Sequence, residues 1–137
     1  TIILNHVGGP LGVGPYAGKR DAIFPDWKES MTALAASPNV VVKVGGLVMP
    51  VCGFDWHERT MPTASGELAR ETAPYYLHCI EQFGPGRCMF ESNFPVDKVA
   101  CSYTVLWNAF KRLAHGFTPG EQAALFHDTA ARVYRLS

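Results

Sequence analysis

Three short apolar runs divide the chain, and polar or glycine-rich residues follow each of them. The runs are Ile2–Leu4, Val40–Val44 and Cys88–Phe90. Short apolar, partly β-branched runs between turn-forming residues predict buried strands. The third run follows Gly-Pro-Gly and stops before Pro95, which cannot donate a hydrogen bond to a sheet.

Helical spacing of apolar residues fills the segments between and after these runs. Residues 25–37 form one predicted helix, because Trp27, Met31 and Leu34 share a face and Pro38 follows. Before the third strand, a short helix capped by Ser65 is followed by one that starts at Thr72 and Pro74 and stops at Gly84. After the third strand, one helix around Leu106 and Phe110 stops at Gly116, and another runs from the Thr118 capping box to about His127. The last predicted helix covers residues 129–135 and is capped by Asp128.

The order of strands and helices predicts an α/β fold with a parallel sheet. Each connection between two predicted strands contains a helix, so right-handed crossovers should place the three strands parallel and adjacent, in chain order. His6, Lys43 and Asn93 would then lie at the carboxyl end of the sheet, where α/β proteins carry their chemistry. Along an extended strand, Glu91 and Asn93 would share one face.

Composition narrows the class of protein. The chain has 137 residues, of which 47% are hydrophobic and 18% charged, as in one ordinary globular domain. Twelve basic and twelve acidic residues balance, without a cationic run, which argues against nucleic-acid or membrane partners. No apolar stretch approaches membrane-spanning length, so a cytoplasmic protein is expected. Four scattered cysteines without a CxxC pair predict buried, reduced thiols.

The third strand and the residues after it carry a resemblance to a known family. The sequence RCMFESNFP resembles the last-strand signature of the amidohydrolase-2 branch of the amidohydrolase superfamily, which reads Arg, two apolar residues, Gly-Ser-Asp, an aromatic residue and Pro. The matching residues are Arg87, Phe90, Ser92, Phe94 and Pro95. Glu91 stands in the place of the usual Gly, and Asn93 in the place of the Asp that serves the family as metal ligand and general base.

The resemblance implies a fold. With NHVGGP and PNVVVKVGGL before it, the motif resembles strands six to eight of a (β/α)8 TIM barrel. Residues 1–137 would be the C-terminal segment of a single TIM-barrel amidohydrolase domain, about three βα units plus C-terminal helices. A small three-stranded doubly wound sheet, complete in itself, is the alternative fold.

The resemblance also implies a function. The expected protein is a hydrolase of the amidohydrolase-2 type, lactonase-like, acting on a lactone, ester or amide bond of a small carboxylated compound. The alternatives are a decarboxylase, whose family shares the signature, and a non-catalytic ligand-binding barrel that has lost its general base, because Asn93 cannot accept a proton near neutral pH.

Seven residues are candidates for the site. In the family, a His in the position of His6 binds metal or substrate, so a divalent metal, zinc or manganese, is the implied cofactor. Glu91, Asn93 and Asp97 are the catalytic candidates, with Glu91 as displaced base, ligand or structural partner of Lys43 and Asp97 as a base in the loop at the mouth of the site. Lys43, His57 and Arg59 are candidate substrate-binding residues. The expected partners are a small-molecule substrate and either another copy of the chain or the remaining strands of the barrel.

Overall fold

The computed structural model describes residues 1–136 as a parallel three-stranded sheet with helices packed on it. The strands are β1 (Ile2–Leu4), β2 (Val40–Val44) and β3 (Cys88–Phe90), in the order β1-β2-β3. Both strand pairs are parallel, with Ile3 opposite Val41 and Lys43 opposite Met89. The predictions of an α/β class and of three parallel, adjacent strands in chain order are confirmed.

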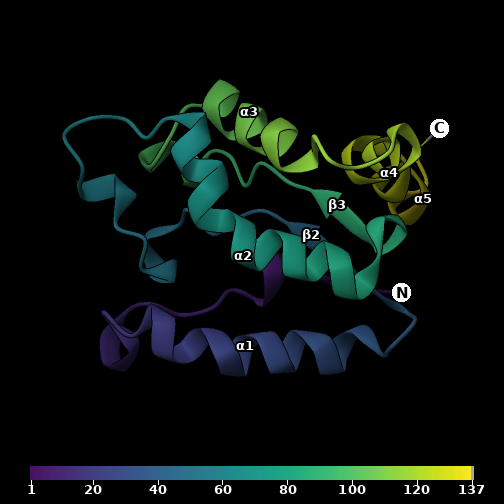
Figure 1. The fold of residues 1–137 in the computed structure, drawn as a ribbon, viewed down its shortest axis with the longest axis horizontal. Helices are drawn as coiled ribbons and strands as arrows, with labels where there is room; N and C mark the ends of the chain where they lie inside the picture. The colour runs from purple at the N-terminus through teal and green to yellow at the C-terminus, as the bar shows by residue number, and fades with distance from the viewer. Residues whose placement is uncertain (137) are drawn as a thin grey trace.

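The helices connect the strands and follow the last one. They are α1 (Arg20–Ala35), α2 (Ser65–Phe83), α3 (Tyr103–Ala114), α4 (Pro119–Ala123) and α5 (Thr129–Tyr134), with a π-helical turn, Ala124–Asp128, between the last two. Figure 1 shows α2 across β2, with α1 on one side of it and α3 on the other. The helices α4 and α5 lie at the end where the strands begin, and the long loops lie at the opposite end.

Two prolines lie inside helices, which corrects two predicted boundaries. Helix α1 begins at Arg20, before Pro25 rather than at it. One continuous helix, α2, replaces the two predicted around Ser65 and Thr72, with Pro74 in its interior. The Thr72 hydroxyl donates to the Leu68 carbonyl at 2.8 Å. A hydrogen bond to the carbonyl four residues earlier shows that Thr72 lies inside the helix rather than at its start. A proline removes one donor from a helix, and the broad buried face of α2 outweighs that loss.

The C-terminal helices differ from the prediction in one detail. The capping box of Thr118 and Glu121 is present and begins α4. Asp128 does not cap a new helix, because its backbone is helical and its side chain makes no cap hydrogen bond. The π-helical turn carries the chain from α4 into α5 without a break.

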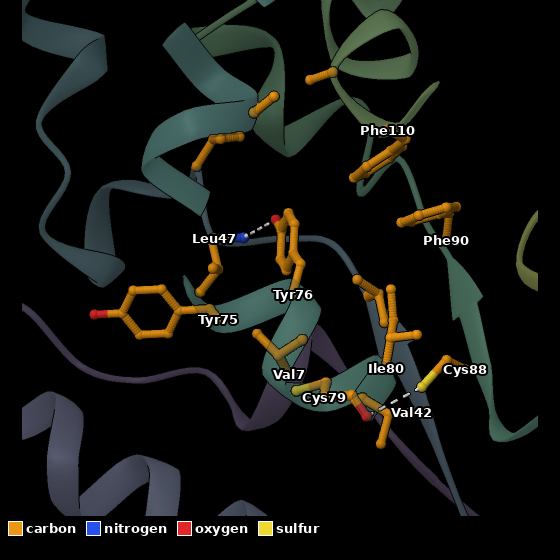
Figure 2. Packing of buried hydrophobic residues seen from close by; sticks show 14 of the residues in the cluster. Val7, Val42, Leu47, Tyr75, Tyr76, Cys79, Ile80, Cys88, Phe90 and Phe110 are labelled. Carbon is orange, nitrogen blue, oxygen red and sulfur yellow. Dashed lines mark hydrogen bonds between the residues drawn. The ribbon is translucent and has the colours of Figure 1, made fainter. Parts of the chain in front are cut away.

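The core lies between the sheet and the helix layer. Val40, Val42 and Val44 alternate into it from β2, so Val41 and Lys43 lie on the opposite face of the sheet. Phe90 of β3 stacks on Phe110 of α3, with ring centroids 4.5 Å apart, as Figure 2 shows.

Polar contacts also lie within this core. The buried Tyr76 hydroxyl of α2 accepts a hydrogen bond from the Leu47 amide at 3.4 Å (Figure 2). This contact ties the turn after β2 to α2, and it holds the chain where the site is built.

Two predictions from composition can be checked on the same residues. All four cysteines are free and buried, as predicted. Within residues 1–136, no helix has both the length and the apolar character needed to cross a membrane.

Candidate active site at the carboxyl end of the sheet

His6 follows β1 in a backbone turn that few non-glycine residues adopt. His6 and Val7 have φ values of 54° and 46°, both in the left-handed region. The turn is fixed from inside the protein, because the Val7 side chain is fully buried and the Val7 carbonyl accepts a hydrogen bond from the Trp27 indole at 2.9 Å. Strained turns that the surrounding structure holds in place are typical of functional sites.

The Glu91 carboxylate lies between His6 and Lys43. Its Oε1 atom is 2.5 Å from Nδ1 of His6 and accepts the His6 backbone N–H at 3.1 Å. Its Oε2 atom is 3.5 Å from Nζ of Lys43, so the predicted pairing of Glu91 with Lys43 is present in the structure. The three strands therefore each deliver one side chain to a single charged cluster: His6 after β1, Lys43 in β2 and Glu91 after β3.

Lys43 is held as a cation. Burial opposes its charge, but interactions with Tyr134 and Glu91 outweigh burial and raise the Lys43 pKa. Its Nζ atom lies 5.8 Å from the centroid of the Tyr134 ring, which α5 contributes. Both oxygens of Glu91 are thus engaged, one by an imidazole and one by an ammonium group.

Asn93 and Asp97 form a second polar pair, within the segment that follows β3. Asn93 Nδ2 donates to Asp97 Oδ1 at 2.7 Å. Asn93 has a φ of 50°, and β3 ends at Phe90, so the predicted strand alternation of Glu91 and Asn93 does not extend to Asn93.

Asp97 is buried rather than placed at an open mouth of the site. Its side chain lies in the 3-10 turn Val96–Val99 with no exposed surface, and its Oδ2 atom has no hydrogen-bond partner in the described part of the chain. Burial raises the Asp97 pKa to about 7, against the lowering effect of the Asn93 hydrogen bond, and the nearby charge of Glu91 raises it further.

His57 and Arg59 lie outside the charged cluster. Arg59 pairs with Glu67 at 2.5 Å, and His57 lies 4.0 Å from the exposed Glu58. Their neighbour Trp56 is buried and stacks on Phe54. Arg59 does line a cavity of about 340 Å³ between the loops that follow β2 and β3, together with Lys98.

The donor atoms of this cluster do not suit a divalent metal on their own. Nδ1 of His6 faces Glu91, both Glu91 oxygens are engaged, and Asn93 offers only a neutral amide. Residues 1–136 contain no group of three His, Cys, Asp or Glu side chains arranged to hold a metal. Nε2 of His6 is the one free nitrogen of the cluster, so these residues do not form a metal site by themselves.

Comparison with known proteins finds relatives along almost the whole chain. The family model described as Amidohydrolase matches residues 1–136. The chain is 41% identical over 135 residues to the protein y4mH of Sinorhizobium fredii, covering 98% of this chain and 39% of that protein. It is 32% identical over 138 residues to the L-fucono-1,5-lactonase of Burkholderia multivorans, covering 98% of this chain and 43% of the lactonase.

Solved structures show the same fold. A crystal structure of an amidohydrolase from Burkholderia multivorans with bound HEPES superposes with a TM-score of 0.81 at 31% identity, over 98% of this chain and 44% of that one. A zinc-bound crystal form gives a TM-score of 0.80 at 31% identity, with the same coverage. The chain thus spans about two fifths of the length of the relatives it matches.

Proposed function

The chain belongs to the amidohydrolase family, and from that membership we propose that the complete protein is a hydrolase that opens a lactone, ester or amide bond of a small carboxylated compound. The family match over residues 1–136 supports hydrolase chemistry in general, and the lactonase relative supports a lactone as the first substrate to try. We also propose that residues 1–137 form the C-terminal part of a TIM barrel, completed by further strands of the same protein or by another copy of it.

His6 is the group of this chain that acts on the substrate. Its Nε2 atom makes no hydrogen bond within residues 1–136, and its side chain is 29% exposed at the carboxyl end of the sheet. Nε2 accepts the proton of a water molecule as the water oxygen bonds to the substrate carbonyl carbon. When the carbon–oxygen bond of the lactone breaks, the proton passes from Nε2 to the departing oxygen, and a hydroxy acid is released.

A divalent metal is the alternative to the general-base role of His6 in the complete protein, because both would use the same Nε2 lone pair. The zinc-bound relative supports metal binding within the family, and zinc or manganese would take Nε2 of His6 from this chain. A divalent ion supplies Lewis-acid polarisation of a carbonyl. Residues 1–136 alone offer no set of three such ligands, so the site would need ligands from the rest of the protein.

Two cations line a cavity between the loops that follow β2 and β3. Arg59 and Lys98 line the cavity of about 340 Å³ between the two loops, a volume that fits a small organic acid. Glu91 balances the charge of Lys43, and Glu67 balances that of Arg59. We therefore assign recognition of the substrate carboxylate to Lys98, with Arg59 beside it in the cavity. Lys43 supports the charged cluster, and His57 lies outside both.

One observation favours a second function. Asn93 replaces the carboxylate of the family signature, which is what a ligand-binding protein without hydrolytic activity would show. In that case the same cavity would bind a carboxylated ligand and release it unchanged.

The test is lactone hydrolysis by the complete protein, followed as acid release in a pH-stat. Wild type should turn over a sugar lactone, and His6→Gln should lower kcat about 10²–10⁴-fold, the usual contribution of a general base. His115→Gln is the matched control, because His115 is exposed at the end of α3. Full activity of His6→Gln would contradict the proposal, and activity in Asn93→Asp alone would favour the ligand-binding protein.

A further inference from the structure

Glu91 occupies a position where the family signature has a glycine, and its side chain is more enclosed than an ion-pair partner on the surface. It is 13% exposed. Its Oε1 atom accepts a hydrogen bond from the His6 backbone N–H and contacts Nδ1 of the His6 ring. An ionised carboxylate only accepts hydrogen bonds, so the short contact places a proton on Nδ1 of His6. In the neutral imidazole, Nε2 then carries the free lone pair.

The turn after β2 is shaped around these two side chains. A Cβ atom on Gly45 would lie 2.2 Å from the Glu91 carbonyl oxygen and 2.6 Å from Glu91 Cγ. A Cβ atom on Gly46 would lie 2.4 Å from Nδ1 of His6, and Gly46 also has a φ of 76°. Side chains at these positions would push Glu91 and His6 apart. The glycine pair therefore allows the His6–Glu91 contact.

From this geometry we propose that Glu91 is a positioning residue, which fixes the proton on Nδ1 of His6 and thereby presents an unprotonated Nε2 to the substrate. Gly45 and Gly46 form the cradle in which this orientation is possible, and Lys43 holds the second oxygen of Glu91 so that the carboxylate cannot turn away. The role of Nε2 toward the substrate rests on the proposed function, whereas the orientation of the imidazole does not.

An ion pair with Lys43 accounts for only one of the two Glu91 oxygens. It explains the Oε2 contact but not the two contacts that Oε1 makes with His6. A free imidazole distributes its proton over both nitrogens, so selection of one tautomer is a specific effect of the carboxylate. Partners of this kind typically change activity 10–100-fold when they are removed.

The experiment is nitrogen NMR of the complete protein labelled with ¹⁵N-histidine, with His6→Gln to assign the His6 resonances. At a pH where the imidazole is neutral, Nε2 of His6 should resonate as an unprotonated nitrogen. In Glu91→Gly, which introduces the residue of the family signature, the Nε2 resonance should move toward the protonated position and kcat should fall about 10–100-fold. Glu91→Gln, which keeps the side-chain shape, should move Nε2 in the same direction.

The control is Glu81→Gln, because Glu81 is exposed on α2. It should leave the His6 resonances and kcat unchanged. A protonated Nε2 in wild type, or an unchanged tautomer in both Glu91 variants, would overturn the proposal. A tautomer change in a protein that hydrolyses no lactone would support Glu91 as the positioning residue and would count against the proposed function alone.

Discussion

The two ends of the sheet each hold a charged side chain in a dense network of contacts, but the networks differ in kind. At the end where the strands begin, Arg87 donates only to backbone carbonyls: to Phe83 at 2.9 Å, to Ser37 at 3.0 Å, to Val40 at 3.4 Å and to Ala35 at 3.0 Å. These carbonyls lie at or just after the ends of α1 and α2 and at the start of β2. A cation at the carboxyl ends of helices is electrostatically favourable, so this network is fully consistent with a structural role.

At the other end, side chains contact side chains, and several groups are strained or unsatisfied. His6, Val7 and Asn93 have positive φ values. The Oδ2 atom of Asp97 is buried without a partner in the described residues. Strain and unpaired polar groups cost stability, and proteins carry them where they serve chemistry. The comparison teaches that Arg87 stabilises the fold, whereas the proposed site at the other end contains strained and unpaired groups that cost stability.

The largest expected effect concerns Asp97 and the pH dependence of stability. Burial raises its pKa in the folded state to about 7 from the ordinary value of 3.8, so between these pH values the folded protein binds the proton that the unfolded chain releases. The free energy of unfolding should therefore fall as pH rises from about 4 to about 7, by up to about 4 kcal/mol.

Asp97→Asn keeps the shape and removes this titration. The variant should match wild type near pH 3 and be more stable at pH 8, as measured by urea unfolding of the complete protein across that range. Identical pH profiles of the two proteins would show that ionising Asp97 does not lower the free energy of unfolding. That result would remove one difference between the two ends of the sheet.

The next effect belongs to the structural end. Arg87→Met leaves the carbonyls around it without their donor and should lower the free energy of unfolding by about 3 kcal/mol. Arg70→Met is the matched control, because Arg70 is exposed and its one ion pair within residues 1–136 is with Glu71. It should change stability by less than about 0.5 kcal/mol. Folded Arg87→Met should keep the wild-type kcat. A selective loss of kcat with unchanged stability would reverse the roles of the two ends.

The smallest effect on stability comes from the glycine cradle. Gly46→Ala places a Cβ against His6 in a left-handed backbone conformation and should destabilise the fold by about 2 kcal/mol. Gly66→Ala is the control within α2, where nothing lies within 4 Å of the added atom, and it should be neutral or stabilising by up to about 1 kcal/mol. Thermal melts of both variants would measure the difference. A Gly46→Ala protein as stable as Gly66→Ala would contradict a tightly packed cradle.

Much of the fold could be predicted from sequence, because its signals are local. The apolar runs gave all three strands, and the helical connections between them gave their parallel order. The misplaced helix boundaries share one cause, since the local preference of Pro25 and Pro74 predicts helix starts. Burial of a long helical face is a tertiary effect, which the local preference of proline does not reveal.

The site was less predictable, because its contacts depend on register. His6 and Glu91 are 85 positions apart, and their contact requires both neighbouring strand pairs to be aligned as they are. The burial of Asp97 depends in the same way on how the turn after Pro95 folds inward. One signal was available: two successive glycines directly after β2 indicate a close approach by other groups, although not which groups approach.

The most direct test of the account is a double-mutant cycle on kcat/KM for lactone hydrolysis by the complete protein. It compares wild type, His6→Gln, Glu91→Gln and the double variant. If Glu91 acts through His6, Glu91→Gln should cost about 10–100-fold in wild type but less than about threefold when His6 is already Gln. An equal cost of Glu91→Gln in both backgrounds would show that the two side chains act independently, and would contradict a cluster organised around His6.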